Sequence, residues 1–205
     1  AAGTSLTAFE FMPRIVMDFV LKHARGTRDP FPVRHDWYTL LEVSGLKPDG
    51  SAERIMTQIL ETALERGLAV DATLASSLGQ ARDFWRLRES ISEAQKYEGG
   101  NVKNDVSVPI AKIPDFIARA DALVLEVCPG ARPLALGHFG DGNVHYNIAQ
   151  PVDMPKAEFL KLWHPIQQAV NAAVMEFGGS ISAEHGIGVM KRDELVEYRK
   201  FVPTI

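Results

Sequence analysis

Two histidines flank a strong turn signal in residues 137–147, which read GHFGDGNVHYN. Asp141-Gly142 favours a two-residue hairpin loop, because both central residues of a type I′ turn need a positive φ. With these two residues as the loop, His138 lies directly opposite His145, on one face and with Cβ atoms about 4.5–5.5 Å apart. Two imidazoles at that spacing can hold one metal ion, although an ordinary hairpin with two surface histidines is the alternative. Asn147 lies two residues beyond His145, so it shares that face.

A second stretch adds the donor type that such a metal site lacks. Residues 181–188, ISAEHGIG, follow Gly178-Gly179 and contain Glu184 and His185. Two histidines and one carboxylate, with a coordination position left open, form the kind of site that catalytic zinc uses. The sequence does not show whether this stretch meets the hairpin, so a shared site is a hypothesis.

Composition restricts the class of protein. The 205 residues are 46% hydrophobic and carry a net charge of −4, which suits one globular domain, or two small ones, with a substantial core. The mild acidity and the lack of a basic run argue against a nucleic-acid partner. Cys128 is the single cysteine, so no internal disulfide can form, and a reducing, cytoplasmic location is expected. No apolar run reaches the ~18 residues of a membrane span, and residues 1–6 do not resemble a signal peptide.

The N-terminal half contains both helical and extended patterns. Thr7 and Glu10 have capping-box spacing ahead of an apolar stripe over residues 11–20, which predicts a helix. Further predicted elements are a loop at 25–35, a strand at 37–43, a helix at 52–65, a short strand at 68–70 and a long helix at 74–97. On the long helix Arg88 and Ser92 are four residues apart and share a face, either as a functional pair or as an ordinary solvated pair.

The C-terminal half predicts a sheet with helices. Lys103 lies near the start of a predicted strand at 102–108. The other predicted elements are the two hairpin strands and helices at 114–127, 155–177 and 189–200. This order predicts an α+β fold, in which helices cover one face of an antiparallel sheet as in a ferredoxin-like sandwich. There is no Gly-x-Gly-x-x-Gly after a strand and no Gly-x-x-x-x-Gly-Lys, so a dinucleotide-binding or P-loop domain has no support.

Four segments, in this order, resemble signature segments of a known family, the FAD-linked oxidase C-terminal domain. They are WRLRE at 85–89, KNDVSVP at 103–109, the hairpin at 137–147 and SAEHGIG at 182–188. Members of that family include D-lactate dehydrogenases, the glycolate oxidase flavoprotein subunit and D-2-hydroxyglutarate dehydrogenase, all flavoproteins of the vanillyl-alcohol oxidase type. The resemblance covers most of the chain, from about residue 7 to residue 200, and four ordered motifs are far more specific than one.

The resemblance implies a role for each of eight polar residues. It implies that a divalent metal, usually zinc, is bound by His138, His145 and Glu184, and that His185 is the active-site base. It further implies that the substrate is held by Arg88, Ser92, Lys103 and Asn147. The 2-hydroxyglutarate enzymes have threonine where this chain has Ser92, which keeps the hydroxyl but leaves the identity of the substrate open.

The resemblance also implies what accompanies the chain. Residues 1–205 correspond to the substrate-binding cap domain, and FAD is bound mainly by an N-terminal domain that this chain lacks. We therefore expect the chain alone to bind no FAD and to be inactive. The intact enzyme is expected to oxidise a D-2-hydroxy acid of the lactate, glycolate or 2-hydroxyglutarate type. Its expected partners are that acid, its own FAD domain and an electron-accepting protein or quinone, with a homodimer and peripheral membrane attachment as further alternatives.

Two other classes of function stay open on the residues alone. The first is a metal-stabilised interaction module, which a closed site with four protein ligands would favour. The second is a metal-dependent hydrolase that works without flavin, which would turn over esters or phosphoesters by itself.

Overall fold

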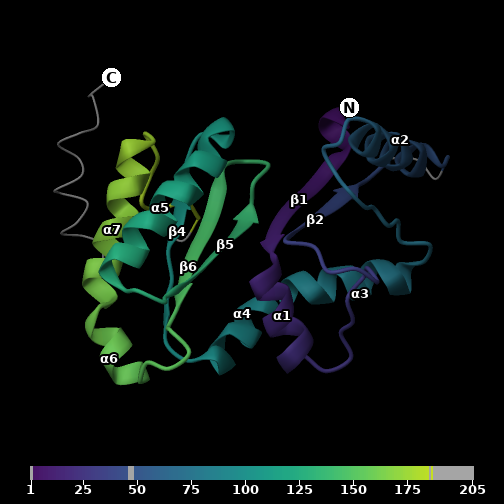
Figure 1. Cartoon of the computed structure of the whole chain (residues 1–205). Coiled ribbons are helices and arrows are strands. Elements are labelled where there is room, and N and C mark those ends of the chain that lie inside the picture. The colour runs from purple at the N-terminus through teal and green to yellow at the C-terminus, as the bar shows by residue number, and fades with distance from the viewer. Residues whose placement is uncertain (1, 46–48, 185, 187–205) are drawn as a thin grey trace. The chain divides into compact units, whose positions relative to one another are not determined.

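The computed structural model describes residues 2–45, 49–184 and 186, and the chain divides into two compact units, Ala1–Ala94 and Gln95–Ile205 (Figure 1). Each unit combines an antiparallel pair or sheet of strands with helices. Among the described residues, none of the helices has both the length and the apolar character that crossing a bilayer requires.

The first unit is built on two antiparallel strands, β1 (Leu6–Pro13) and β2 (Trp37–Val43), which pair from Pro13 opposite Trp37 to Leu6 opposite Val43. Its helices are α1 (Arg14–His23), α2 (Ser51–Glu65), α3 (Leu78–Glu89) and α4 (Ile91–Ala94), with a 3₁₀ turn at Gly3–Ser5. The buried apolar side chains come mainly from α1, α3 and α4, and include Val16, Phe19, Val20, Leu87 and Ile91.

The predicted capping box at Thr7 and Glu10 is wrong, because both residues belong to β1. The Thr7 hydroxyl donates to the Glu42 side chain on β2 at 3.0 Å instead of closing a helix turn. Pairing of β1 with β2, which is irregular only between Leu6 and Ala8, satisfies backbone groups that a helix start would leave open. The apolar stripe predicted for the following helix is confirmed, but α1 begins only at Arg14, directly after Pro13.

The predicted long helix at 74–97 is divided. Ser77 caps α3 by accepting the N–H of Gln80 at 3.2 Å, and Ser90 separates α3 from α4. The Ser90 N–H bonds to Arg86 and its carbonyl accepts from Ala94, so this serine ends one helix and begins the next. Serine suits such a position because its hydroxyl competes for nearby backbone groups. The short strand predicted at 68–70 is also wrong, since these residues form bends after α2.

The second unit contains an antiparallel sheet with β6 (Asn143–Ala149) paired on both edges. On one edge lies β5 (Arg132–His138), and on the other lie the short strands β3 (Asn101–Val102) and β4 (Asp105–Ser107). The helices α5 (Ile113–Val127) and α7 (Trp163–Glu176) lie side by side against this sheet, with α6 (Lys156–Lys161) before α7 (Figure 1). Short 3₁₀ turns occupy Gln95–Glu98 and Ile110–Lys112. The predicted α+β class, an antiparallel sheet with helices, is confirmed.

Two predicted elements of this unit are interrupted, one at a proline and the other at a buried asparagine. The helix predicted at 155–177 breaks at Leu162. Pro165 has no N–H to donate to the preceding turn and its ring clashes with that turn, so a helix cannot run through it undisturbed. The strand predicted at 102–108 divides at Lys103 and Asn104, where the buried Asn104 amide donates to the Tyr146 carbonyl at 3.0 Å. The helix predicted at 189–200 lies outside the described residues.

A part-buried hydrogen bond joins the sheet to α5. The Tyr146 hydroxyl of β6 donates to Asp121 at 2.5 Å, and the Tyr146 ring packs edge-on against Phe116 with centroids 5.7 Å apart. Burial raises the pKa of the Asp121 carboxyl above its usual range, and the hydrogen bond from Tyr146 lowers it in part. This face of the sheet is therefore the one that the helices cover.

We expect Tyr146→Phe to lower the free energy of unfolding by about 1.5–3 kcal/mol at neutral pH, because the half-buried carboxylate of Asp121 loses a hydrogen bond. The loss should shrink as the pH falls. The folded-state pKa of Asp121 already lies above its unfolded value, and the variant removes the interaction that lowers it. The folded protein therefore takes up the proton first and regains stability in acid. Urea unfolding at two pH values, in a double-mutant cycle with Asp121→Asn, measures this coupling; a pH-independent loss would contradict it.

Candidate metal and substrate site

The hairpin that carries the two histidines has a four-residue loop. Strands β5 and β6 pair with Leu136 opposite His145. Continued to the turn, this register places His138 opposite Asn143, so the predicted two-residue loop and the direct pairing of His138 with His145 are wrong. The loop closes through the Asp141 N–H, which bonds to the His138 carbonyl at 3.2 Å, and through the Asp141 carboxylate, which accepts the N–H of Asn143 at 3.1 Å. Such an Asx turn offers the backbone an alternative to a type I′ turn.

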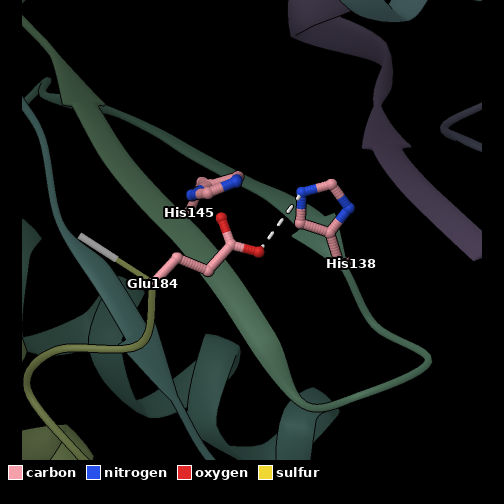
Figure 2. A group of neighbouring side chains, drawn as sticks. All are labelled: His138, His145 and Glu184. Atoms are coloured by element: carbon pink, nitrogen blue, oxygen red, sulfur yellow. Dashed lines mark ion pairs between the residues drawn. The ribbon is translucent and has the colours of Figure 1, made fainter. Parts of the chain in front are cut away.

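Both histidines nevertheless project from one face. The predicted and observed registers differ by two residues, and a shift of two preserves the side of the sheet on which each residue lies. The two imidazoles are diagonal neighbours, with ring centroids 5.3 Å apart and planes at 80° (Figure 2). Tyr146, the next residue along β6, faces α5, so the histidines lie on the opposite face from these helices.

Close backbone approach explains two glycines of this hairpin. Gly142 has φ +87°, and a Cβ there would lie 2.6 Å from the Val108 carbonyl oxygen. The Val108 N–H in turn bonds to the Gly142 carbonyl at 3.0 Å. Gly137 has φ +143°, and a Cβ there would lie 2.8 Å from the carbonyl oxygen of Asn143. The sequence around the histidines thus permits a tight turn tied to the end of β4.

The second stretch reaches the hairpin along β4. Ser180 and Ser107 exchange two backbone hydrogen bonds, of 2.9 and 2.8 Å, in an antiparallel bridge. The Ala183 N–H continues this contact by donating to the Asp105 carbonyl at 3.2 Å. Gly179 allows the approach, since a Cβ there would lie 2.2 Å from the Ser107 carbonyl oxygen. The meeting of the two stretches, which the sequence could not show, is a feature of the fold.

Glu184 completes a group of three metal-ligand side chains with His138 and His145 (Figure 2). One donor atom from each of the three lies within 4.8 Å of the others, and His138 Nε2 is 3.9 Å from Glu184 Oε1. Zinc with bonds of about 2.0–2.2 Å holds tetrahedral donor atoms about 3.3–3.6 Å apart, so small side-chain adjustments suffice. Both donor types and their spacing fit a divalent metal with a position open for a further ligand.

Asp105 contacts two of these candidate ligands, His145 and Glu184, and no pattern in the sequence pointed to it. It is opposite His145 in the β4–β6 pair, with Oδ1 3.5 Å from His145 Nδ1. Its Oδ2 accepts the backbone N–H of Glu184 at 2.9 Å. Its position two residues after Lys103 in a predicted strand placed both residues on one face. Only the register of β4 against β6 shows that this face also carries His145.

Asn147 lies on the same face of β6 as His145, as strand alternation predicted. It is buried, and its amide donates to Gln95 Oε1 at 3.2 Å. The same oxygen accepts the amide of Asn101 at 3.0 Å. Lys103 is exposed between β3 and β4. These contacts hold the Asn147 amide in a defined orientation, whereas the lysine ammonium is accessible to solvent.

Arg88 and Ser92 belong to the first unit. Arg88 Nε donates to Glu10 Oε2 at 2.7 Å, in a pair whose side chains are only 13% and 4% exposed. The alternative of an ordinary solvated arginine is therefore wrong, while Ser92 is exposed on α4. The division at Ser90 means that the two residues do not share one continuous helix. The expected base, His185, lies outside the described residues.

Comparison with known proteins identifies the family. The sequence matches the family described as FAD linked oxidases, C-terminal domain, over residues 1–202. It is 37% identical over 195 residues to a D-2-hydroxyglutarate dehydrogenase of Xanthomonas citri pv. viticola, covering 95% of this chain and 40% of that protein. A mitochondrial D-2-hydroxyglutarate dehydrogenase of Arabidopsis thaliana is 36% identical over 204 residues, covering 99% of this chain and 34% of that protein.

A D-2-hydroxyglutarate dehydrogenase of Stutzerimonas stutzeri is 36% identical over 211 residues, covering 98% of this chain and 44% of that protein. The chain thus spans less than half the length of these relatives. The similarity includes all four segments that carry the resemblance seen in the sequence, since the match to the family runs through residues 1–202. The chain therefore belongs to the family of FAD linked oxidases, C-terminal domain.

Proposed function

We propose that this chain is the substrate- and metal-binding part of an FAD-dependent dehydrogenase that oxidises a D-2-hydroxy acid to the 2-oxo acid. The observation that carries the proposal is the group formed by His138, His145 and Glu184, whose donor atoms lie within 4.8 Å of one another. The names of the relatives favour D-2-hydroxyglutarate among the candidate substrates. Lactate and glycolate are the comparison substrates.

Residues 1–205 act in this proposal as the substrate-binding domain, and a separate N-terminal domain binds FAD. Support comes from the greater length of the relatives, of which the chain covers 40%, 34% and 44%. The flavin, when bound, accepts the hydride, so this chain contributes binding and orientation.

Three residues hold the metal and a fourth moves the proton. We assign His138, His145 and Glu184 as ligands of a divalent ion, with zinc favoured by two imidazoles and one carboxylate. Such an ion supplies Lewis-acid polarisation of the substrate hydroxyl. His185, adjacent to Glu184 in sequence, is assigned as the base that accepts the hydroxyl proton.

The substrate carboxylates are assigned to the side chains of Arg88, Ser92, Lys103 and Asn147. Arg88 has its Nε committed to Glu10, which orients the guanidinium so that its terminal nitrogens can form a fork onto a carboxylate. Ser92 and Lys103 are exposed and contribute a hydroxyl and an ammonium. Asn147, held by Gln95, offers an oriented amide on the face that carries His145.

The test of the proposed function is reduction of FAD in the flavin-containing enzyme that includes this chain. Under anaerobic conditions, D-2-hydroxyglutarate should bleach the flavin band, whereas the L-enantiomer should not. The double variant His138→Ala, His145→Ala should lose this reduction while retaining its FAD. Bleaching at the parental rate in that variant would reject the metal centre as part of the reaction.

The 205-residue chain by itself should be colourless after purification. The flavin-binding role is assigned to a separate domain, so nothing in the chain should retain FAD through gel filtration. The measurement is the absorbance spectrum of the purified chain after incubation with excess FAD. A flavin band that elutes with the protein would contradict this division of the enzyme.

Glu184→Gln and His185→Gln should separate metal binding from proton transfer. Glu184→Gln should lower metal content, because a neutral amide is a poorer ligand than a carboxylate. His185→Gln should keep metal content near that of the parent and reduce turnover by roughly 10²–10⁴-fold, the usual contribution of a positioned acid–base group. Glu158→Gln, an exposed glutamate of α6, is the matched control. The reverse pattern, with metal lost only from His185→Gln, would exchange the two assignments.

Arg88→Lys should weaken substrate binding more than it destabilises the fold. Lysine keeps the positive charge beside Glu10 but loses the planar fork, so affinity for D-2-hydroxyglutarate should fall about tenfold or more. The free energy of unfolding should fall by less than the free energy of substrate binding does, because the lysine ammonium can still pair with Glu10. Calorimetric binding and urea unfolding measure the two effects, with Arg119→Lys in the exposed Arg119–Glu176 pair as control. Lost stability with unchanged affinity would make Arg88 a structural residue.

A further inference from the structure

We infer that Asp105 is a positioning residue that fixes two of the proposed metal ligands, His145 and Glu184, through the two oxygens of one carboxylate. The inference rests on the proposed function, because it assumes that these residues bind a metal. The new element is the assignment of the Asp105 carboxylate as the group that orients these ligands in the metal-free protein.

The fold directs the Asp105 side chain to the metal-ligand face. Asp105 and His145 are cross-strand partners in the β4–β6 pair, and directly opposite residues share a face. Val106, the next residue, is fully buried on the other face and pairs with Val144. A slip of β4 by one residue would bury the carboxylate and expose this valine, so the core holds Asp105 in place.

One oxygen of Asp105 faces the imidazole. Oδ1 lies 3.5 Å from His145 Nδ1, and the two side chains are 12% and 19% exposed. A carboxylate beside Nδ1 favours the tautomer with its proton on that nitrogen, because an acceptor faces it. The lone pair of Nε2 is then free to bind a metal, an arrangement that also raises the basicity of the ligand.

The other oxygen of Asp105 holds the segment that carries Glu184. Oδ2 accepts the Glu184 backbone N–H at 2.9 Å, and the Asp105 carbonyl accepts the N–H of Ala183 at 3.2 Å. Together with the bridge between Ser107 and Ser180, these bonds attach residues 180–184 to β4. One residue therefore controls the tautomer of one ligand and the backbone position of another.

Asp105→Asn tests this role with nearly unchanged side-chain volume. The amide can turn its N–H₂ toward His145 and stabilise the tautomer with the proton on Nε2, where the metal should bind. We expect the affinity of the 205-residue chain for Zn²⁺, measured by competition with a chromophoric chelator, to fall about 10–100-fold. In the metal-free chain, ring ¹⁵N shifts assigned with His145→Gln should show His145 protonated on Nδ1 in the parent and on Nε2 in the variant.

Two further variants control for charge and for folding. Asp153→Asn removes an exposed carboxylate of the same unit and should leave Zn²⁺ affinity and ring shifts unchanged. Asp105→Glu retains the carboxylate, so its Zn²⁺ affinity should lie between those of the parent and Asp105→Asn, and it replaces Asp105→Asn in the comparison if that variant does not fold. Circular dichroism establishes that each compared variant is folded.

The outcomes separate this inference from the proposed function. A parent chain that binds no Zn²⁺ rejects the metal centre and this inference with it. A parent that binds Zn²⁺, with Asp105→Asn binding as tightly as Asp153→Asn, rejects the positioning role alone. The role is also overturned if Asp105→Asn binds Zn²⁺ more weakly but leaves the His145 tautomer unchanged. It is overturned as well if Asp105→Glu binds Zn²⁺ no more tightly than Asp105→Asn.

Discussion

Strand β6 is hydrogen-bonded along both of its edges, to β5 on one side and to β3 and β4 on the other. Its alternate residues Val144, Tyr146 and Ile148 are fully buried. Burying a large apolar side chain contributes about 1.5–3 kcal/mol, so a one-residue slip that moved all three to the other face would be costly. The same register fixes which way the polar residues between them point. Burial of apolar residues on one face of β6 thus fixes the positions of the candidate site residues on the other face.

The end of β4 is the common attachment of the two loops that carry the candidate ligands. Val108 bonds to Gly142 of the hairpin loop, and Ser107 bridges to Ser180 ahead of Glu184. At both places the backbones approach so closely that a Cβ on the loop glycine, Gly142 or Gly179, would collide with the carbonyl oxygen of Val108 or Ser107. These glycines allow backbone hydrogen bonds that hold the two loops in place. A binding site needs its ligands held within a fraction of an ångström by such surrounding bonds.

Buried ion and hydrogen-bond partners orient the other polar residues. Glu10 holds Arg88 by Nε, and Gln95 holds the Asn147 amide. Such buried pairs gain little net stability, because removing the charges from water is costly. Their value on the proposed function is pre-organisation: a guanidinium or amide that is already oriented loses less freedom when a substrate binds. On the same proposal the redox chemistry belongs to the flavin, so orientation is what this chain would contribute.

Local patterns in the sequence were sufficient to predict much of the architecture. The helical stripe of α1, the strand at Trp37–Val43, the helices α2 and α5, and the hairpin strands follow from apolar periodicity, proline and glycine. The α+β class follows from their order. The prediction that His138 and His145 share a face was also correct, because a register error of two residues leaves every side chain on the same face of the sheet.

The remaining features depend on contacts between residues far apart in the chain. Whether Thr7 and Glu10 cap a helix or extend a strand is decided by the partner strand β2, and the hairpin register is decided by the Asx turn and by the tie to Val108. The approach of Glu184 to the histidines and the position of Asp105 behind them require the pairing of β4 with both β6 and Ser180. Local propensities differ by about 1 kcal/mol or less per residue, so long-range pairing and burial overrule them.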